Sequence, residues 1–183
     1  MLGCKKSAYG VLVAAILLAS AAANEPQKAA SSQENGKNAA AAFERIKKLA
    51  GDWEVANPKD ASEKGKTAVR YHVTSGGSAV VETLFPGTEL EMLTVYHRDG
   101  EQLVLTHYCA LGNQPHARAK FGGDKDEIAF EFAGGCCLNA DKDAHMHNFR
   151  VRFVDADHVH EEAQLYAGGK AGETHGFDLV RKK

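Results

Sequence analysis

The sequence predicts an all-β fold, an antiparallel up-and-down barrel of about ten strands that follows a short helix. Short segments of alternating apolar and polar residues succeed one another from Trp53 to the C-terminus. Glycine-containing turns separate them, and the connections are too short for the crossovers of a Greek-key sandwich. A chain with so many strands must protect its sheet edges, and the meandering order favours closing the sheet over stacking two sheets.

The N-terminal segment has the pattern of a secretory signal peptide, which we assign to residues 1–23. Lys5 and Lys6 precede an apolar stretch, 9–19, that is too short to span a bilayer, and Ala21-Ala22-Ala23 provides small residues for cleavage. A retained membrane anchor is the alternative. The sequence therefore predicts an exported protein, periplasmic or secreted, without stable membrane insertion after signal cleavage.

The mature chain divides into two parts by composition. Residues 24–40 are rich in Ala, Ser, Gln, Asn and Lys without apolar periodicity, which predicts a disordered tether. Residues 41–183 have the length of one domain with a single core and are assigned to the barrel. Within this part, Phe43, Ile46 and Leu49 recur at helical spacing before Gly51, which predicts a helix of about two turns.

Strands follow in sequence, each justified by its alternation and by the turn that ends it. In 67–74, Val69, Tyr71 and Val73 share one face, and two glycines at 76–77 supply the positive φ angles of a hairpin turn. Asp99-Gly100 is a strong hairpin signal between two further strands. The predicted strands begin at Trp53 and then cover 67–74, 79–85, 90–97, 101–109, 116–121, 127–133, 145–154, 158–166 and 174–181.

The segment Leu49-Ala50-Gly51-Asp52-Trp53, a helix end running into Gly-x-Trp on the first strand, resembles the opening of lipocalin-like (calycin-type) barrels. The strand count is also similar to that of fatty-acid-binding and nitrobindin-type relatives, and the whole resembles uncharacterised exported bacterial proteins of this kind. The resemblance implies that a basic residue of the last strand, here Arg181, packs on Trp53 through a cation–π contact. A second lipocalin motif, Thr-Asp-Tyr in a turn, has no counterpart, since the nearest turn reads Asp155-Ala156-Asp157.

Charge and cysteine content limit the possible partners. The formal net charge is −2, and no stripe of basic residues with interleaved aromatics appears, so nucleic acid is excluded as an expected partner. After signal cleavage Cys109, Cys136 and Cys137 remain, an odd number. In an oxidising compartment Cys109 could pair with either Cys136 or Cys137, or all three could be buried as small apolar side chains.

The nine histidines raise the alternative of a metal or haem site. His145 and His147 lie two residues apart on one strand, at the parity of Phe149, so both should point inward. His107 and Cys109 share the parity of the apolar Leu103 and Leu105. If these strand ends meet, His107, Cys109, His145 and His147 form a set of nitrogen and sulfur ligands suited to zinc, copper or haem iron. No cofactor is required by the sequence, and the histidines could instead face solvent at the barrel mouth.

The expected function is non-covalent binding of a small, partly apolar molecule inside the barrel, where apolar side chains bury it and polar groups orient it. Arg118 is a candidate clamp for a ligand carboxylate. The candidate ligand-binding residues are Tyr71, Leu105, His107, Asn113, Arg118, Phe130, Phe132, His147, Phe149 and Val151. A structural barrel filled with side chains is the remaining alternative.

No catalytic group is assigned, because no nucleophile has a visible base and orienting partner. Glu82 and Glu91 are interpreted as solvated strand glutamates. His158 and His160, beside Glu161 and Glu162, are interpreted as an exposed face.

Overall fold

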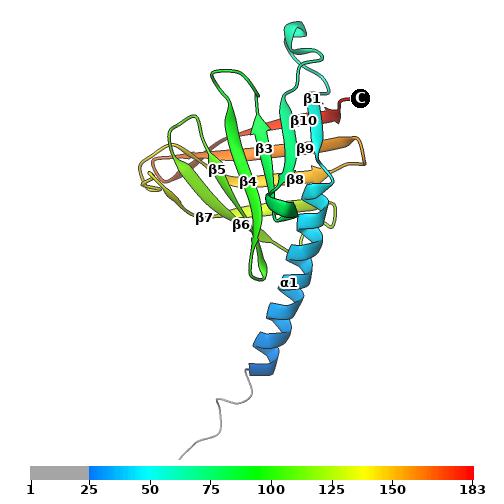
Figure 1. Cartoon of the computed structure of the whole chain (residues 1–183). Helices are drawn as coiled ribbons and strands as arrows, with labels where there is room; N and C mark the ends of the chain where they lie inside the picture. The colour runs from blue at the N-terminus through cyan, green and yellow to red at the C-terminus, as the bar shows by residue number, and fades with distance from the viewer. Residues whose placement is uncertain (1–24) are drawn as a thin grey trace, which may run out of the picture.

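The computed structural model describes residues 25–183, with side chains from Gln33 onward (Figure 1). The predicted signal peptide lies outside the described residues. One α-helix precedes ten strands, and two short 3₁₀ turns lie at Ala61–Glu63 and Ser75–Gly77. The elements are α1 (Glu25–Lys47), β1 (Gly51–Val55), β2 (Val69–Thr74), β3 (Ala79–Leu84), β4 (Met92–Asp99), β5 (Gln102–Tyr108), β6 (Gln114–Lys120), β7 (Glu127–Cys136), β8 (His145–Phe153), β9 (His158–Ala167) and β10 (Lys170–Arg181).

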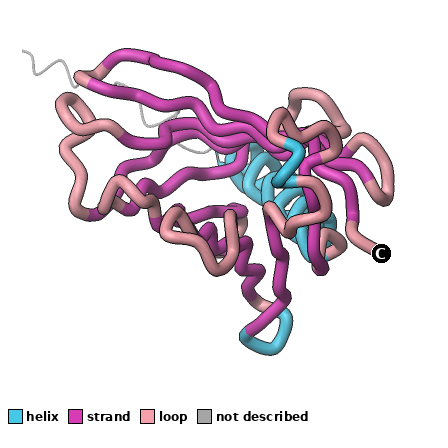
Figure 2. Tube along the Cα trace, turned by 90° about the horizontal axis from the view of Figure 1, so that it is seen from above, coloured by secondary structure: helices cyan, strands magenta, loops and turns pink. Residues whose placement is uncertain are grey.

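The ten strands form a closed antiparallel barrel, which confirms the predicted fold class. Each strand pairs with its neighbours in sequence, and β1 pairs with β10 to close the sheet, with Trp53 opposite Arg181. Figure 2 shows that strands make up most of the chain and that helical segments are confined to α1 and the two short turns. Closure leaves the sheet without a free edge, as expected for a chain of many short strands.

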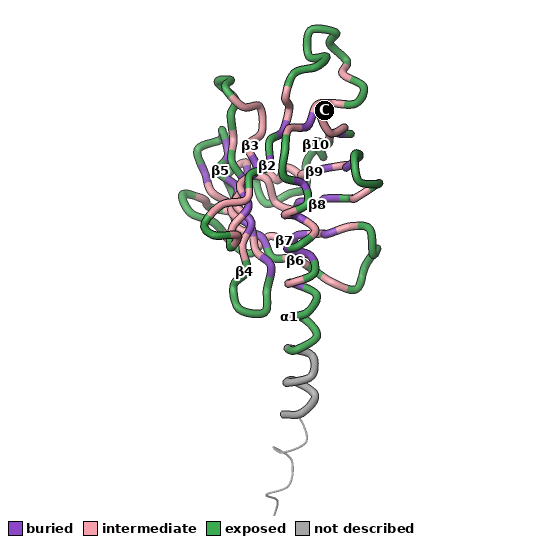
Figure 3. Tube along the Cα trace, turned by 45° about the vertical axis from the view of Figure 1, so that its right-hand side comes forward, coloured by how far each residue is buried: buried purple, intermediate pink, exposed green. Residues whose placement is uncertain are grey.

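Strand alternation places the side chains as the sequence predicts in the first hairpin. Val69 and Tyr71 of β2 are buried, whereas Arg70 and His72 are exposed on the outer face. Figure 3 shows buried positions on the strands and on the part of α1 next to the barrel, and exposed positions at the loop tips. The core therefore occupies the barrel interior and extends to the helix.

The helix α1 is longer than predicted, and this corrects the tether assigned to residues 24–40. From Glu25 onward these residues are helical. Ala39, Phe43 and Ile46 are buried against the barrel, at the i, i+4, i+7 spacing of one helix face. Alanine has the highest helix propensity and buries a small side chain without entropic cost, so an Ala-rich segment can extend a helix that a barrel anchors. Among the described residues, no helix combines the length and apolar character needed to cross a membrane.

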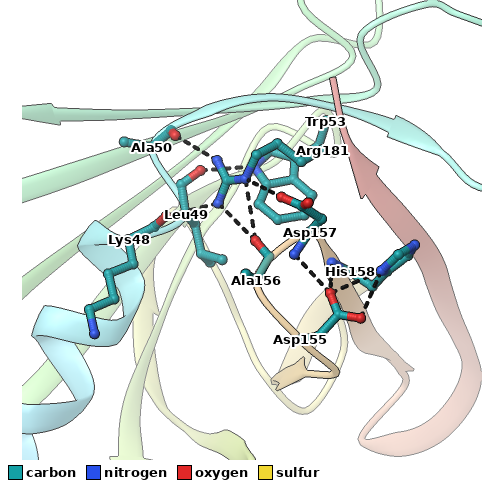
Figure 4. A network of polar contacts seen from close by, with 9 residues as sticks. All are labelled: Lys48, Leu49, Ala50, Trp53, Asp155, Ala156, Asp157, His158 and Arg181. Atoms are coloured by element: carbon teal, nitrogen blue, oxygen red, sulfur yellow. Dashed lines mark hydrogen bonds and ion pairs between the residues drawn. The ribbon is translucent and has the colours of Figure 1, made fainter. Parts of the chain in front are cut away.

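The C-terminal part of α1 and the first strand close one end of the barrel around Trp53 (Figure 4). The Arg181 guanidinium lies over the Trp53 ring, 4.3 Å from its centroid, so the contact implied by the resemblance is present. Arg181 also donates hydrogen bonds of 2.9 Å to the carbonyls of Lys48 and Ala50, beyond the last turn of α1. Helix ends leave carbonyl groups without intrahelical partners, and a guanidinium fork can satisfy two of them at once.

Trp53 is itself fully buried, and its indole Nε1–H donates a 2.8 Å hydrogen bond to the Leu49 carbonyl. A buried indole that lacked this partner would leave a donor unsatisfied at a cost of about 1–3 kcal/mol. The helix end, the first strand and the last strand are thus joined at one residue. We call this closed end, formed by α1, Trp53 and Arg181, the plug.

Candidate ligand site inside the barrel

A cavity of about 280 Å³ lies within the barrel. Neighbouring strands alternate in direction, and β1 begins at the plug. The plug end therefore also holds the connections 75–78, 99–101 and 154–157. The segment after β3 lies at the opposite rim. Phe85 and Phe177, which line the cavity at this rim, meet edge to face with 5.6 Å between ring centroids. The lining residues are Glu82, Leu84, Phe85, Met92, Thr94, Tyr96, His107, Met146, Phe149, Arg150, Val151, Glu161, Glu162, Ala163, His175 and Phe177.

A larger depression, of about 1190 Å³, lies on the outside of the barrel wall. It is lined by outward-facing residues such as Arg70 and Thr83 and shares Phe85 and Phe177 with the interior cavity. Its lining includes none of the buried carboxyl groups of the interior. The chemistry described below therefore belongs to the smaller cavity.

Cross-strand pairing assembles a polar row on the inner wall of β2 to β5. Tyr71 lies opposite Glu82, Glu82 opposite Thr94, and Thr94 opposite His107. Directly opposed residues of antiparallel strands have Cβ atoms about 5 Å apart, so their side chains touch on the shared face. The four side chains are all buried. Glu161 joins this row from β9.

Two buried carboxyl groups form the centre of the site. Glu82 is 4% exposed and Glu161 is 7% exposed. The Tyr96 hydroxyl donates a 2.6 Å hydrogen bond to Glu82 Oε2, and the Tyr71 hydroxyl donates one to Glu161 Oε1. The two tyrosine rings lie 6.5 Å apart. Each carboxyl therefore has a tyrosine donor.

Burial favours the protonated form of both carboxyl groups. Burial raises the pKa of Glu82, although hydrogen bonds from Tyr96, Thr94 and Glu161 act in the opposite direction. Burial raises the pKa of Glu161 well above its usual value, and the neighbouring charge of Glu82 raises it further. Of the two groups, Glu161 has the pKa that is raised further, so its carboxyl holds a proton more tightly than that of Glu82. Burial and a neighbouring negative charge together oppose ionisation of both groups.

His107 completes the polar wall and carries an unused nitrogen. Its Nδ1 lies 3.0 Å from Thr94 Oγ1, and its Nε2 is buried without a hydrogen-bond partner. Because the Thr94 hydroxyl donates its single proton to Glu82, it can only accept from His107 Nδ1–H. This leaves the Nε2 lone pair without a partner. Burial lowers the pKa of His107 to about 4, so the ring is neutral at neutral pH.

The structure brings only part of the predicted ligand-binding set to the cavity. His107, Phe149 and Val151 line it, and Tyr71 reaches it through Glu161. Leu105 and Phe130 are buried in the core without lining the cavity.

Two predicted residues of the β5–β6 region do not belong to the cavity. Asn113 is buried beyond β5, where its Nδ2 donates to the Ala144 carbonyl. Arg118 is exposed on the outer face of β6 opposite Glu131, so it cannot clamp a carboxylate inside the barrel.

A β-bulge in β8 corrects the predicted orientation of His145 and His147. The register with β9 shifts between Met146 and Asn148, so one extra residue changes which side chains face inward. Met146 lines the cavity, and the His147 ring is stacked between Phe132 and Tyr166, at centroid distances of 4.4 and 3.8 Å. The predicted inward parity therefore does not hold on the N-terminal side of Phe149.

The predicted metal-ligand set is not assembled. His145 Nε2 lies 2.9 Å from His147 Nδ1, so these two rings form a hydrogen bond with each other. His107 is engaged with Thr94, and Cys109 is buried with a pKa raised by burial. Within residues 25–183, no group of three or more His, Cys, Asp or Glu side chains is arranged to hold a metal ion.

The glutamates at the centre of the site were missed by the sequence analysis. From the sequence, Glu82 is interpreted as solvated and Glu161 is named only as a neighbour of the predicted exposed face of His158 and His160, but both glutamates are buried. The alternation Val80-x-Glu82-x-Leu84 is a signal that could have found the first, because the flanking apolar residues share its face. Val159-x-Glu161-x-Ala163 gives the same signal for the second.

All three cysteines of the described chain are free thiols, so the structure forms neither of the disulfides considered. Cys109 is buried, whereas Cys136 and Cys137 are exposed. In protein that begins at Asn24, we expect two thiols to react rapidly with a thiol reagent such as dithionitrobenzoate and the third only after unfolding, since burial disfavours the thiolate. The variant Cys109→Ser should keep the rapid count unchanged; a disulfide would instead lower it in the wild-type protein.

Searches of protein-family models and of curated proteins find no match to this chain.

Proposed function

We propose that this protein is an exported, lipocalin-like (calycin-type) barrel that binds a small, partly apolar molecule in its interior. The observation that supports this most is the cavity of about 280 Å³, which combines aromatic and aliphatic lining with a buried polar wall and an unpartnered nitrogen on His107. Ligand sites are typically concave and mostly apolar, with a few placed polar groups that fix orientation. The cavity volume lies just below the usual range of about 300–1,000 Å³, which favours a ligand smaller than a drug-sized molecule.

Burial of the ligand's apolar surface would drive binding. Leu84, Met92, Phe149 and Val151 offer apolar walls on several strands. At about 25 cal/mol per Å² of apolar surface removed from water, even a small ligand gains several kcal/mol before the costs of ordering. A barrel filled only by its own side chains would leave no such cavity, so the cavity favours the container over the structural alternative.

Filling the cavity should abolish binding. The variant Ala163→Phe places a ring among the lining residues, whereas Ala167→Phe adds the same ring at an exposed position of the same strand. Native mass spectrometry of protein purified from its own compartment should show an organic adduct on the wild-type protein and on Ala167→Phe, and none on Ala163→Phe. The polypeptide mass also tests cleavage before Asn24.

A second measurement tests for binding even if the natural ligand is lost during purification. Titration with 1-hexanol and 2-phenylethanol should raise the melting temperature of the wild-type protein but not that of Ala163→Phe. Equal adducts and shifts in both proteins, or a bare wild-type mass with no shift, would refute the proposal.

A further inference from the structure

The buried carboxyl pair lacks a cationic partner. Its contacts are Tyr71, Tyr96, Thr94 and the two carboxyls themselves. In the part of the chain that the structure describes, no ion pair joins Glu82 or Glu161 to a Lys, Arg or His. A buried carboxylate is usually paired, because its desolvation costs several kcal/mol. A negative charge on this pair is therefore held by hydroxyl groups alone.

The inner wall offers hydrogen-bond acceptors to the cavity and keeps its donors occupied. The hydroxyls of Tyr71, Tyr96 and Thr94 are all donated to carboxyl oxygens. His107 gives its Nδ1–H to Thr94 and leaves the Nε2 lone pair unused, on a side chain that is only 3% exposed. The carboxyl pair and His107 thus line the cavity, and the Nε2 lone pair of His107 has no donor from the protein. A ligand that fits this wall supplies N–H groups.

The apolar part of the lining also suits a cation. Tyr96 and Phe149 lie beside the polar row, and Phe85 and Phe177 lie at the rim. Aromatic faces attract an ammonium group through their quadrupole, most strongly when the contact is desolvated. Arg150, the arginine that lines the cavity, is paired with Glu162 at 3.4 Å, and Arg118, the side chain expected to grip an anionic head group, lies outside the barrel.

We propose that the interior site takes a small organic amine, bound as its ammonium form with N–H donors to the Glu82–Glu161 pair and to His107 Nε2. This inference rests on the proposed function, since it names the class of the ligand held in the same cavity. The ammonium supplies the charge that the carboxyl pair lacks, and the hydrocarbon body fills the apolar part of the cavity. An anionic ligand of the same shape would meet the carboxyl pair as a like charge.

Matched ligands of different charge test this inference. One set is 2-phenylethylammonium, 2-phenylethanol and 3-phenylpropanoate, and a second is hexylammonium, 1-hexanol and hexanoate. Isothermal titration calorimetry at pH 7, on protein that begins at Asn24, should show each ammonium binding at least tenfold tighter than its alcohol. The carboxylates should show no binding at millimolar concentration.

Variants test whether the preference for the ammonium ligand depends on the carboxyl pair. The double variant Glu82→Gln/Glu161→Gln keeps both side-chain shapes and removes the negative charge of the pair, so it should lower the ammonium affinity at least tenfold while leaving the alcohol affinity within threefold. Glu131→Gln, an exposed strand glutamate on β7, should change neither. Circular dichroism confirms that each variant is folded.

The outcomes separate the two proposals. A carboxylate or an alcohol that binds as tightly as its ammonium, or an ammonium preference that survives the double Gln variant, overturns the amine inference and leaves the proposed container function intact. Failure of all six compounds to bind overturns both. An ammonium preference that the double Gln variant removes establishes the inference.

Discussion

Replacing His107 with Gln is expected to remove from this protein an acid-dependent loss of stability of about 3 kcal/mol. Burial holds the pKa of His107 at about 4, against 6.5 for an unperturbed imidazole. Between these values the unfolded chain binds a proton that the folded chain does not. Stability is therefore fully present above pH 6.5 and falls as the pH drops toward 4. At about 1.4 kcal/mol per pKa unit, the shift gives roughly 3 kcal/mol.

Urea unfolding at pH 7 and pH 4 measures this effect, as the difference between the two pH values in wild type and in His107→Gln. The buried glutamates act in the opposite direction, because their raised pKa values favour the folded state as the pH falls. Comparing the pH difference in the two proteins cancels this contribution. His72→Gln, on the exposed face of β2, is the control and should leave the pH difference unchanged. An unchanged difference in His107→Gln would contradict a buried, neutral imidazole.

Trp53→Ala is expected to lower the free energy of unfolding by about 3–5 kcal/mol, the range for removing a large aromatic side chain from a core. The indole is fully buried, donates a hydrogen bond to the Leu49 carbonyl and stacks against the Arg181 guanidinium. Its removal therefore leaves a cavity and an orphaned carbonyl, and it detaches the guanidinium that holds the end of α1.

Because Trp53 is the single tryptophan of the chain, unfolding of Trp53→Ala should be followed by circular dichroism. Tyr108→Ala, at a side chain that is 48% exposed, is the matched control and should change the stability by less than about 0.5 kcal/mol. A loss below about 1 kcal/mol in Trp53→Ala would show that the barrel end does not depend on the plug.

The barrel could be predicted because each strand carries its own signal. Alternation in 67–74 and the turn at Asp99-Gly100 are local features, and they fix which side chains face inward as long as the pairing stays regular. The contact of Trp53 with Arg181 was found through the resemblance to known barrels, since nothing local links residues so far apart in sequence.

The sequence-based predictions that were wrong concern features that depend on contacts between distant parts of the chain. A bulge at His147 reverses the parity of one strand end, and the sequence around it contains no glycine or other marker of the irregularity. The length of α1 depends on tertiary contacts of Ala39 and Phe43 with the barrel. Glu82 and Glu161 follow the inward parity, but carboxyl groups are rarely buried, so intrinsic polarity argued against the correct position.

The plug has a kinetic consequence for any molecule held in the cavity. Because α1 and Trp53 close one end of the barrel and Phe85 and Phe177 line the cavity at the opposite rim, we expect a bound molecule to enter and leave past these two rings. Phe85 keeps a positive φ of 51°, a backbone conformation that is uncommon for a bulky residue. A substitution that weakens the contact between Phe85 and Phe177 without touching the bound molecule would raise the association and dissociation rates by the same factor. The residence time would shorten while the dissociation constant stayed the same.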